Sequence, residues 1–315
     1  MSREMIEQLP LIYNVSAEVD QAFQLHMPIV ALESAVITHG LPRPHNLDLA
    51  LELESEIRRN GAVPATIALM KGKVRIGLTS GEIDQLANAS GARKVSKRDF
   101  AATLVSSRPG GTTVAGTLIA ARQAGIRVFA TGGIGGVHRN APFDVSADLP
   151  ELGRSPLVVV CAGAKAILDL PATLEYLETQ GIPVIGYQTG EFPAFYSRSS
   201  GLKLQDTVKT PREIAMIAMT HWTLGLDSAI LVTVPPPDEF ALPKDLVESA
   251  INQALKDAAK EKISGAEVTP FLLSRVSALS EGKSLAANLA LLRNNARLAA
   301  QIAVELKSLA LLPTR

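Results

Sequence analysis

The sequence predicts an α/β fold, a three-layer α/β/α arrangement with a largely parallel central sheet and a helical C-terminal region. Three observations lead to this prediction. Short apolar runs of β-favouring residues alternate with helical segments through the middle of the chain, their connections are short, and residues 243–315 show helical patterns only. Such alternation is typical of the crossover units that build a parallel sheet.

The first third of the chain predicts one buried strand, a helix and a hairpin. Residues 28–33, PIVALE, predict a strand that ends in a carboxylate. A helix is expected from about 46 to 60, because its apolar residues repeat on one face and Gly61 follows as a stop signal. The runs ATIALM and KVRIGL, on either side of Gly72, predict the hairpin. Two further helices are expected to begin at the caps Ser80 and Ser96, the latter with Asp99 in a box-like signal.

Strand and helix then alternate until a run of three prolines, Pro235 to Pro237, which must leave the sheet because proline cannot donate to it. Helices are predicted for GGTTVAGTLIAARQAG and KAILDLPATLEYLETQG, and strands for IRVFATGG, SPLVVVCAG, IPVIGYQT and SAILVTV. Three amphipathic helices follow, PKDLVESAINQALKDAAKEK, TPFLLSRVSAL and SLAANLALLRNNARLAAQIAVELKSL. We expect a single α/β/α domain over 1–315, with 1–27 as an N-terminal helical extension and 243–315 as helices packed on that domain.

Composition narrows the class of partner. The 315 residues include 31 basic and 31 acidic side chains, so the formal charge is zero. We therefore expect neither nucleic acid nor a membrane as partner, but a small molecule or further copies of this chain. The single cysteine, Cys161, excludes a disulfide framework and favours a cytoplasmic location. The N-terminal residues show no leader pattern, and no apolar run is long enough to predict a membrane-spanning helix.

Lys165 follows the apolar run of 155–163 through a glycine turn, and the pattern predicts that it opens a helix. The carboxyl edge of a parallel sheet is where open α/β folds place their chemistry. A lysine there can hold a phosphate, or, as a free amine, attack a sugar carbon. A surface lysine is the simpler interpretation, but the helix dipole disfavours a cation in a first turn, so the position asks for a reason.

Glu33 ends an otherwise apolar strand. Partial burial there would raise its carboxyl pKa, which is what a general acid needs near neutral pH. The competing interpretation is a carboxylate satisfied by loop amides.

Two segments suit an anionic ligand. Residues 110–113, GGTT, are expected to open a helix, where free amides and the hydroxyls of Thr112 and Thr113 could bind a phosphate or simply cap the helix. In KVSKRD, residues 94–99, Lys94 and its basic neighbours could clamp an anion or form a solvated charge run.

Two further segments could approach substrate or metal. The four glycines of TGGIGGVHR, residues 131–139, would let backbone approach a ligand closely, and His138 beside them either binds substrate or completes the loop. Asp144 and Asp148 in FDVSADL are spaced to hold a hard cation through oxygen, unless one of them caps the next turn.

Taken together, these segments resemble the pseudouridine-5'-phosphate glycosidase family. The resemblance runs from about residue 28 to 305 in one order. It is carried by ALESAVITHGLPRPHN, GAVPATIA, KVSKRD, GGTTVAGT, FATGGIGGVHR, FDVSADL, CAGAKAILD, EYLETQGIPVIGYQT, FPAFYSR, TPFLLSRV and SLAANLALLRNNA. It implies a single α/β/α domain, a homotrimer and one manganese ion (Mn2+) in each site.

The resemblance implies reversible cleavage of pseudouridine 5'-phosphate to uracil and ribose 5-phosphate by a lyase-type enzyme. Lys165 would be the nucleophile that forms a covalent lysine–sugar adduct, a Schiff base, and Glu33 would be the proton donor that protonates the ring oxygen. Asp144 would be the metal ligand, with water completing the shell. Substrate contacts are implied at Lys94, Val114, Ser146, Ala147, Asp148 and Asn288, and we assign the 5'-phosphate to Lys94 with Thr112 and Thr113.

Three departures from the family pattern bear on the site. Ala35 stands where threonine is common, which removes a hydroxyl beside Glu33. The loop from Arg139 to Phe143 is shorter, which affects the expected metal geometry. Lys97 stands where arginine is familiar, and bidentate contact with a phosphate would be lost there.

Two other functions use the same residues. An aldolase-like lyase of class I, acting on another sugar phosphate, also needs a strand-end lysine and a phosphate site. A protein that binds a sugar phosphate without chemistry is the second alternative, and Glu33 on an apolar strand argues against it.

Overall fold

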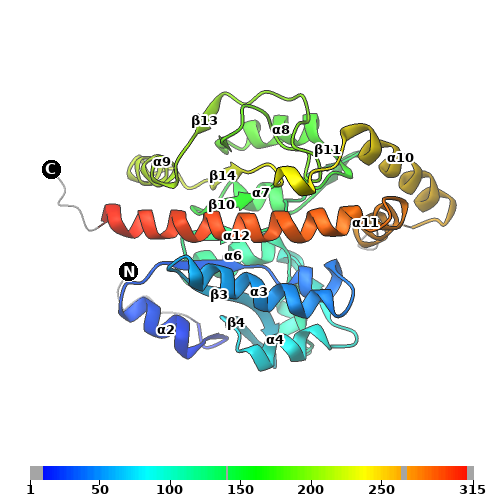
Figure 1. Cartoon of the computed structure of the whole chain (residues 1–315). Coiled ribbons are helices and arrows are strands. Elements are labelled where there is room, and N and C mark those ends of the chain that lie inside the picture. The colour runs from blue at the N-terminus through cyan, green and yellow to red at the C-terminus, as the bar shows by residue number, and fades with distance from the viewer. Residues whose placement is uncertain (1–9, 140, 264–267, 311–315) are drawn as a thin grey trace.

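An 11-stranded sheet forms the centre of the computed structural model, which describes residues 10–139, 141–263 and 268–310 (Figure 1). Its main path runs β1-β4-β3-β2-β7-β10-β14-β12-β13, and β6 joins β3 and carries β5. Among the described strands of this sheet, only the pairs of β3 with β4 and β6 are antiparallel. The strands are β1 (Tyr13–Val15), β2 (Ile29–Leu32), β3 (Val63–Met70), β4 (Lys73–Ile76), β5 (Arg93–Val95), β6 (Gly110–Thr112), β7 (Val128–Ala130), β10 (Val158–Cys161), β12 (Val184–Tyr187), β13 (Asp206–Val208) and β14 (Ile230–Thr233). The predicted α/β fold with a largely parallel sheet is confirmed.

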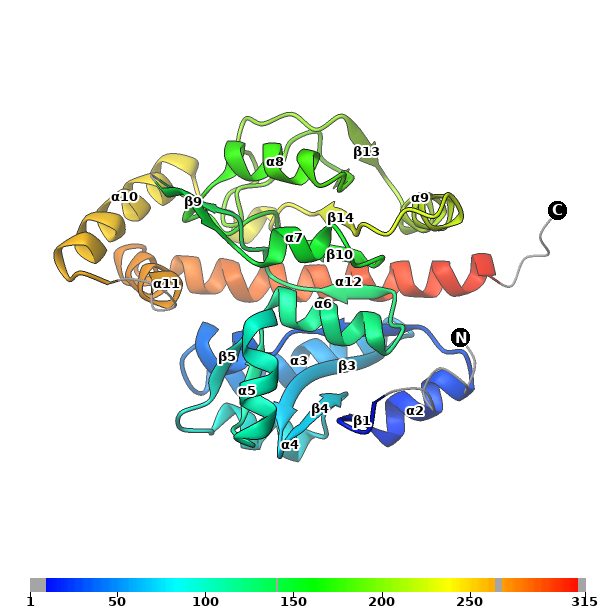
Figure 2. The same cartoon turned by 180° about the vertical axis from the view of Figure 1, so that it is seen from behind.

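Helices cover both faces of this sheet. On one face lie α3 (His45–Arg59), α9 (Pro211–Thr223) and α12 (Lys283–Ala310), and α12 crosses β2, β7 and β10 (Figure 1). On the other lie α6 (Val114–Gln123), α7 (Asp148–Leu152) and α8 (Leu170–Thr179), as Figure 2 shows. Every residue of β2, β7, β10 and β14 is buried, as expected for parallel strands between two helical layers.

The remaining elements lie around this sandwich. The other helices are α2 (Ala17–Gln24), α4 (Ser80–Ala87), α5 (Phe100–Val105), α10 (Lys244–Lys260) and α11 (Val268–Leu279), with short π or 3-10 turns at Val36–Gly40, Lys97–Asp99 and Asp238–Phe240. A second, antiparallel sheet has the order β11-β8-β9, made of β11 (Leu168–Asp169), β8 (Val137–His138) and β9 (Ala141–Val145). This small sheet ties the segment after β7 to the segment after β10.

The element predictions hold except at their ends. The helix predicted for 46–60 is α3, the hairpin is β3–β4 around Gly72 with φ +70°, and the three C-terminal helices are α10, α11 and α12. The cap of α4 is Thr79 rather than Ser80, because the Thr79 hydroxyl accepts from the N–H of Glu82 at 3.2 Å. At Ser96 the predicted box with Asp99 is present.

Two predictions about elements were wrong in part. Residues 110–112 form strand β6 and not the first turn of a helix, since they pair with β3 and β5, and α6 begins at Val114. The N-terminal extension is not helical alone, because β1 pairs with β4 ahead of α2. Residues 1–9 and 311–315 of the predicted terminal segments lie outside the described residues. In the described part of the chain, no helix has the length and apolarity to cross a membrane.

Candidate active site

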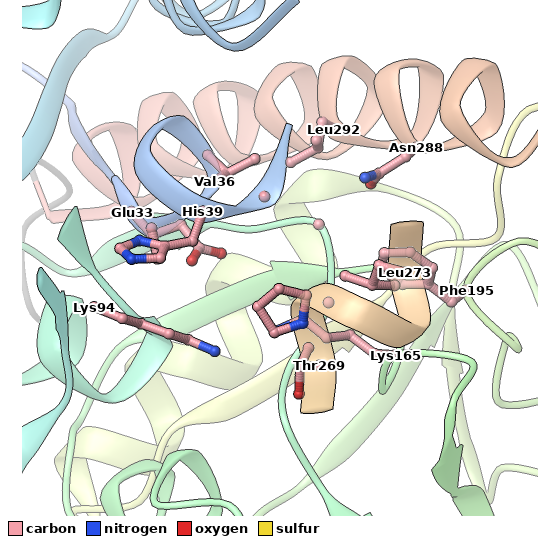
Figure 3. Close-up of a pocket in the computed structure, with 15 residues that line it drawn as sticks. Glu33, Val36, His39, Lys94, Lys165, Phe195, Thr269, Leu273, Asn288 and Leu292 are labelled. Atoms are coloured by element: carbon pink, nitrogen blue, oxygen red, sulfur yellow. The ribbon is translucent and has the colours of Figure 1, made fainter. Parts of the chain in front are cut away.

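Three neighbouring strands end at one pocket. The strands β2, β7 and β10 are adjacent and parallel, so their carboxyl ends meet at the same edge of the sheet. Glu33 follows β2, Gly132 and Gly133 follow β7, and Lys165 follows β10, and all four line the pocket (Figure 3). Its empty volume, counted out to the open mouth and including solvent there, is about 570 Å³.

Glu33 is half-buried and faces this pocket from the end of β2. The Thr131 hydroxyl, from the turn after β7, donates a hydrogen bond to its Oε1. Burial raises the pKa of the Glu33 carboxyl above its ordinary value, while the Lys165 ammonium and the Thr131 hydrogen bond oppose that rise. A carboxyl in this state is suited to give a proton to a bound ligand.

Lys165 lies in the turn between β10 and β11, not in a helix. Its N–H donates to the carbonyl of Ile134 at 3.1 Å, and its carbonyl accepts from the N–H of Leu168 at 3.0 Å. Helix α8 begins only at Leu170, where the Asp169 carboxylate caps it. The prediction that Lys165 opens a helix was wrong, so the helix dipole does not act against its charge. Its placement at the sheet edge is as expected.

Lys94 brings a second amine to the pocket from β5, and its side chain extends toward the other labelled residues in Figure 3. Burial lowers the pKa of Lys94, and the positive charge of Lys165 acts in the same direction. Asp148 and Glu33 oppose that change. The charges of Lys165, Asp148 and Glu33 therefore all act on the Lys94 amine.

The pocket is covered by C-terminal helices. Asn288 and Leu292 reach it from α12, and Thr269, Pro270 and Leu273 reach it from α11 (Figure 3). The structure therefore brings Glu33, Lys94, Lys165 and Asn288 together, although they lie far apart in the sequence.

His39 and Phe195 are among the pocket residues that sequence reasoning did not single out. His39 lies on the π turn directly after Glu33, and its Nδ1 is 2.7 Å from the Thr38 hydroxyl. Burial lowers the pKa of His39, and Lys94 adds to this effect. The signal was its position in the loop after a strand that ends in a carboxylate. Phe195, with φ +62°, packs against Gly133, and no periodicity marks such a residue.

The residues expected to bind phosphate at 112–114 are engaged with the protein itself. Thr112 is fully buried, and its hydroxyl donates to the carbonyl of Ile67 at 2.7 Å. The Thr113 hydroxyl accepts from the N–H of Gly116 at 3.3 Å, as a helix cap. Val114 is buried, and none of the three lines the pocket. Of the predicted phosphate ligands, the structure brings only Lys94 to the pocket.

Asp148 is a buried anchor. Its Oδ1 accepts from the N–H of Ala115 at the start of α6, and its Oδ2 accepts from the N–H of Gly135, both at 2.8 Å. The Ser146 hydroxyl accepts from the N–H of Asp148 at 3.2 Å, while Ala147 is exposed. The carboxylate nevertheless lies near enough to act on the pKa values of Glu33 and Lys94.

The predicted metal ligand, Asp144, is exposed on β9 and does not line the pocket. Across residues 10–139, 141–263 and 268–310, no three His, Cys, Asp or Glu side chains are grouped to hold a metal. The carboxylate chemistry of Asp144 fits a hard cation that keeps most of its water, but both oxygens of Asp148 already accept from amides. Manganese therefore stays a prediction.

His138 is half-buried on β8, where it pairs with Leu168, three residues after Lys165. Ala35 lines the pocket, and Lys97 does not, because its ammonium pairs with the buried Glu151 carboxylate at 3.0 Å. Residue 140, in the shortened loop, lies outside the described residues.

Comparison with known proteins gives one consistent picture. Residues 18–305 match the family model described as "Indigoidine synthase A like protein". The pseudouridine-5'-phosphate glycosidase of Geobacillus kaustophilus is 54% identical over 293 residues, which cover 92% of this chain and 97% of that protein. The protein of the same name from Staphylococcus aureus is 51% identical over 296 residues, covering 93% and 96%.

Two solved structures are similar over most of their length. The prealnumycin C-glycosynthase AlnA, in complex with ribulose 5-phosphate, has a TM-score of 0.88 and 37% identity, covering 96% of this chain and 99% of that one. An indigoidine synthase A-like protein from Thermotoga maritima has a TM-score of 0.84 and 37% identity, covering 89% and 94%.

Proposed function

Because the chain belongs to the pseudouridine-5'-phosphate glycosidase family, we propose that it cleaves pseudouridine 5'-phosphate reversibly to uracil and ribose 5-phosphate. The observation that carries the proposal is the meeting of Glu33 and Lys165 in one pocket, at the ends of strands that share the same sheet edge. The similarity to a C-glycosynthase in complex with a sugar phosphate supports the same chemistry.

The bond to be broken joins two carbons, so protonating an oxygen leaving group, as in ordinary glycosidases, does not break it. A lysine amine provides another route. Glu33 protonates the ribose ring oxygen as the ring opens, and the Lys165 Nζ bonds to the anomeric carbon. The Glu33 carboxylate takes up the proton that the new C–N bond releases and returns it to uracil C5 as the C1'–C5 bond breaks, so that uracil departs and the sugar remains on Lys165 as an iminium. Water then adds, releases ribose 5-phosphate and restores the amine.

The remaining pocket residues are proposed to hold the two ends of the substrate. Lys94 binds the 5'-phosphate as a point charge, and Asn288, above the pocket on α12, faces the uracil ring. Asp148 fixes the start of α6 and the turn at Gly135 through its two hydrogen bonds. The roles predicted for His138 and for the segment 112–114 stay predictions.

A divalent cation, with Mn2+ as the candidate, is proposed to bind Asp144, which is exposed and has oxygen ligands to offer. When bound, such a cation would supply positive charge for an anionic ligand. A homotrimer and a cytoplasmic location stay predictions as well.

The test is release of uracil from pseudouridine 5'-phosphate, followed by chromatography. We expect the wild-type protein to release it, Lys165→Ala to lose it by on the order of 10³-fold or more, and both to remain folded. Lys256→Ala, at an exposed lysine on α10, is the matched control and should leave release unchanged. Full activity of Lys165→Ala would end the mechanism. Cleavage of another sugar phosphate in place of uracil release would favour an aldolase-like lyase. Binding of ribose 5-phosphate without turnover would favour a protein that binds a sugar phosphate without chemistry.

A further inference from the structure

A buried asparagine on α12 contacts the turn that supports Glu33. Asn295 is 0% exposed, and its Nδ2 donates to the carbonyl of Thr131 at 2.8 Å and to that of Gly132 at 3.4 Å. Its Oδ1 is buried and accepts no hydrogen bond within the described part of the chain. A buried polar atom without a partner costs about 1–3 kcal/mol, so a polar residue at this position needs an explanation.

Helix packing alone does not supply one. Apart from Ser284 in its first turn, the other buried residues of α12 are apolar, with Leu291, Leu298 and Ile302 among them. The helix is therefore held by apolar contact with β2, β7 and β10, and a leucine at 295 would add to that contact.

Thr131 is the link between Asn295 and the carboxyl group. Its N–H donates to the carbonyl of Val160 on β10 at 3.0 Å, and its carbonyl accepts from Asn295. With the backbone held from two sides, its hydroxyl is aimed at Glu33, to which it donates. The next residues of the same turn, Gly132 and Gly133, line the pocket.

We propose that Asn295 is a positioning residue that holds the Thr131 turn against Glu33, so that α12 sets the orientation of the proton donor. The proposal rests on the proposed function for its meaning in catalysis. Asn295 itself does not line the pocket and contacts no reacting atom.

The experiment compares Asn295→Leu with Asn294→Leu, which changes the neighbouring, half-buried asparagine of the same helix. For Asn295→Leu we expect kcat for uracil release to fall about 3- to 10-fold with KM unchanged, as for loss of one hydrogen bond. Asn294→Leu should leave both unchanged. Equal losses in the two variants, or a change confined to KM, would overturn the proposal.

The pH dependence of kcat distinguishes a positioning role from a purely structural one, because loss of a purely structural contact would not shift it. The Thr131 hydrogen bond lowers the pKa of Glu33, so weakening it raises that pKa further. Since Glu33 must be protonated to donate, the alkaline limb of kcat should move to higher pH in Asn295→Leu and in Thr131→Val, and stay in place in Thr131→Ser. An unmoved limb in Asn295→Leu would contradict the link.

Two further experiments cover the cases in which Asn295→Leu does not fold or the wild-type protein releases no uracil. If Asn295→Leu does not fold, Asn295→Ala removes the amide without added bulk and is judged by the same criteria; if neither folds, Asn295 is structural and the proposal fails. If the wild-type protein releases no uracil, the proposed function fails, but carboxyl ¹³C titration, assigned with Glu33→Gln, still reports whether Asn295→Leu raises the pKa of Glu33.

Discussion

The pocket and the segment 143–148, which we call the Asp144 segment, differ in how the chain holds their polar side chains. In the pocket, Glu33 directly follows the buried strand β2, and Lys165 follows the buried strand β10 after a short turn. The pairing of these parallel strands through β7 therefore fixes the positions of both residues. In the Asp144 segment, Phe143 is 98% exposed and Asp144 is exposed beside it, whereas Asp148 is buried with both oxygens engaged. The sheet itself positions Glu33 and Lys165, whereas the Asp144 side chain is exposed on β9.

The largest effect expected from a single change, after loss of Lys165, is that of Glu33→Gln. Turnover should fall by about 10²–10⁴-fold, because the amide cannot donate the proton. Glu54→Gln is the matched control: Glu54 is also a buried carboxylate that accepts from a threonine, Thr66 at 2.7 Å, and burial raises its pKa too, but it lies on α3 outside the pocket. Steady-state uracil release checks both. If the two variants lost activity equally, burial rather than the pocket would explain the effect.

Lys94→Met and Lys97→Met compare two lysines of the segment 94–99. For Lys94→Met we expect KM for the nucleotide to rise about 10- to 100-fold, because a charge-assisted contact with the phosphate is worth about 1.5–3 kcal/mol. Lys97→Met should leave KM unchanged, since Lys97 pairs with Glu151 outside the pocket. A rise in KM for Lys97→Met without one for Lys94→Met would contradict the assignment of the phosphate to Lys94.

The Asp144 segment can be divided by replacing each of its two aspartates. In Asp148→Asn the side-chain NH2 group replaces one carboxylate oxygen, so the N–H of Ala115 or of Gly135 loses its acceptor. The free energy of unfolding, measured by denaturant titration, should fall by about 1–3 kcal/mol. Asp144→Asn should change that free energy by less than about 0.5 kcal/mol, as an exposed site, and should weaken Mn2+ binding followed by electron paramagnetic resonance. If Asp144→Asn still bound Mn2+ as tightly as the wild-type protein, Asp144 would be excluded as the metal ligand.

Among the changes made in the pocket itself, the smallest effect is expected at its glycine turn. A Cβ at Gly133 would lie 2.6 Å from the Phe195 ring and 2.9 Å from the carbonyl of Gly163. Gly133→Ala should therefore lower the free energy of unfolding by about 1 kcal/mol in a thermal unfolding experiment, because the added methyl group overpacks the turn. Gly190→Ala, where nothing lies within 4 Å of the added Cβ, is the control and should cost less.

The fold was predictable because its signals are local and repeated. The alternation of apolar runs and helical segments predicts β2, β7 and β10 with their connections, and the parallel sheet then follows. What local pattern could not predict was where each helix begins. Residues 110–112 became a strand because β3 and β5 offered partners, and Lys165 stays outside α8 because Asp169 provides the cap.

The site was predictable in part. The placement of Glu33 and Lys165 at one sheet edge follows from strand ends, the basic run 94–99 singled out Lys94, and the family resemblance added Asn288. Asn295 and Phe195 lie in segments that carry the resemblance, but no periodicity predicts their roles, because the contacts that define these roles come from segments more than 30 residues away. Engagement of Thr112 with Ile67 is also tertiary, because a hydroxyl before a helix looks the same whether it faces ligand or core.

Covalent catalysis requires a bond between the Lys165 amine and the sugar. Borohydride reduction of the protein during turnover with ribose 5-phosphate and uracil, followed by peptide mass spectrometry, traps and locates that bond. We expect one stable sugar-phosphate adduct, on Lys165, and none in Lys165→Ala. An adduct on Lys94 instead, or uracil exchange with Lys165 unmodified, would contradict this expectation.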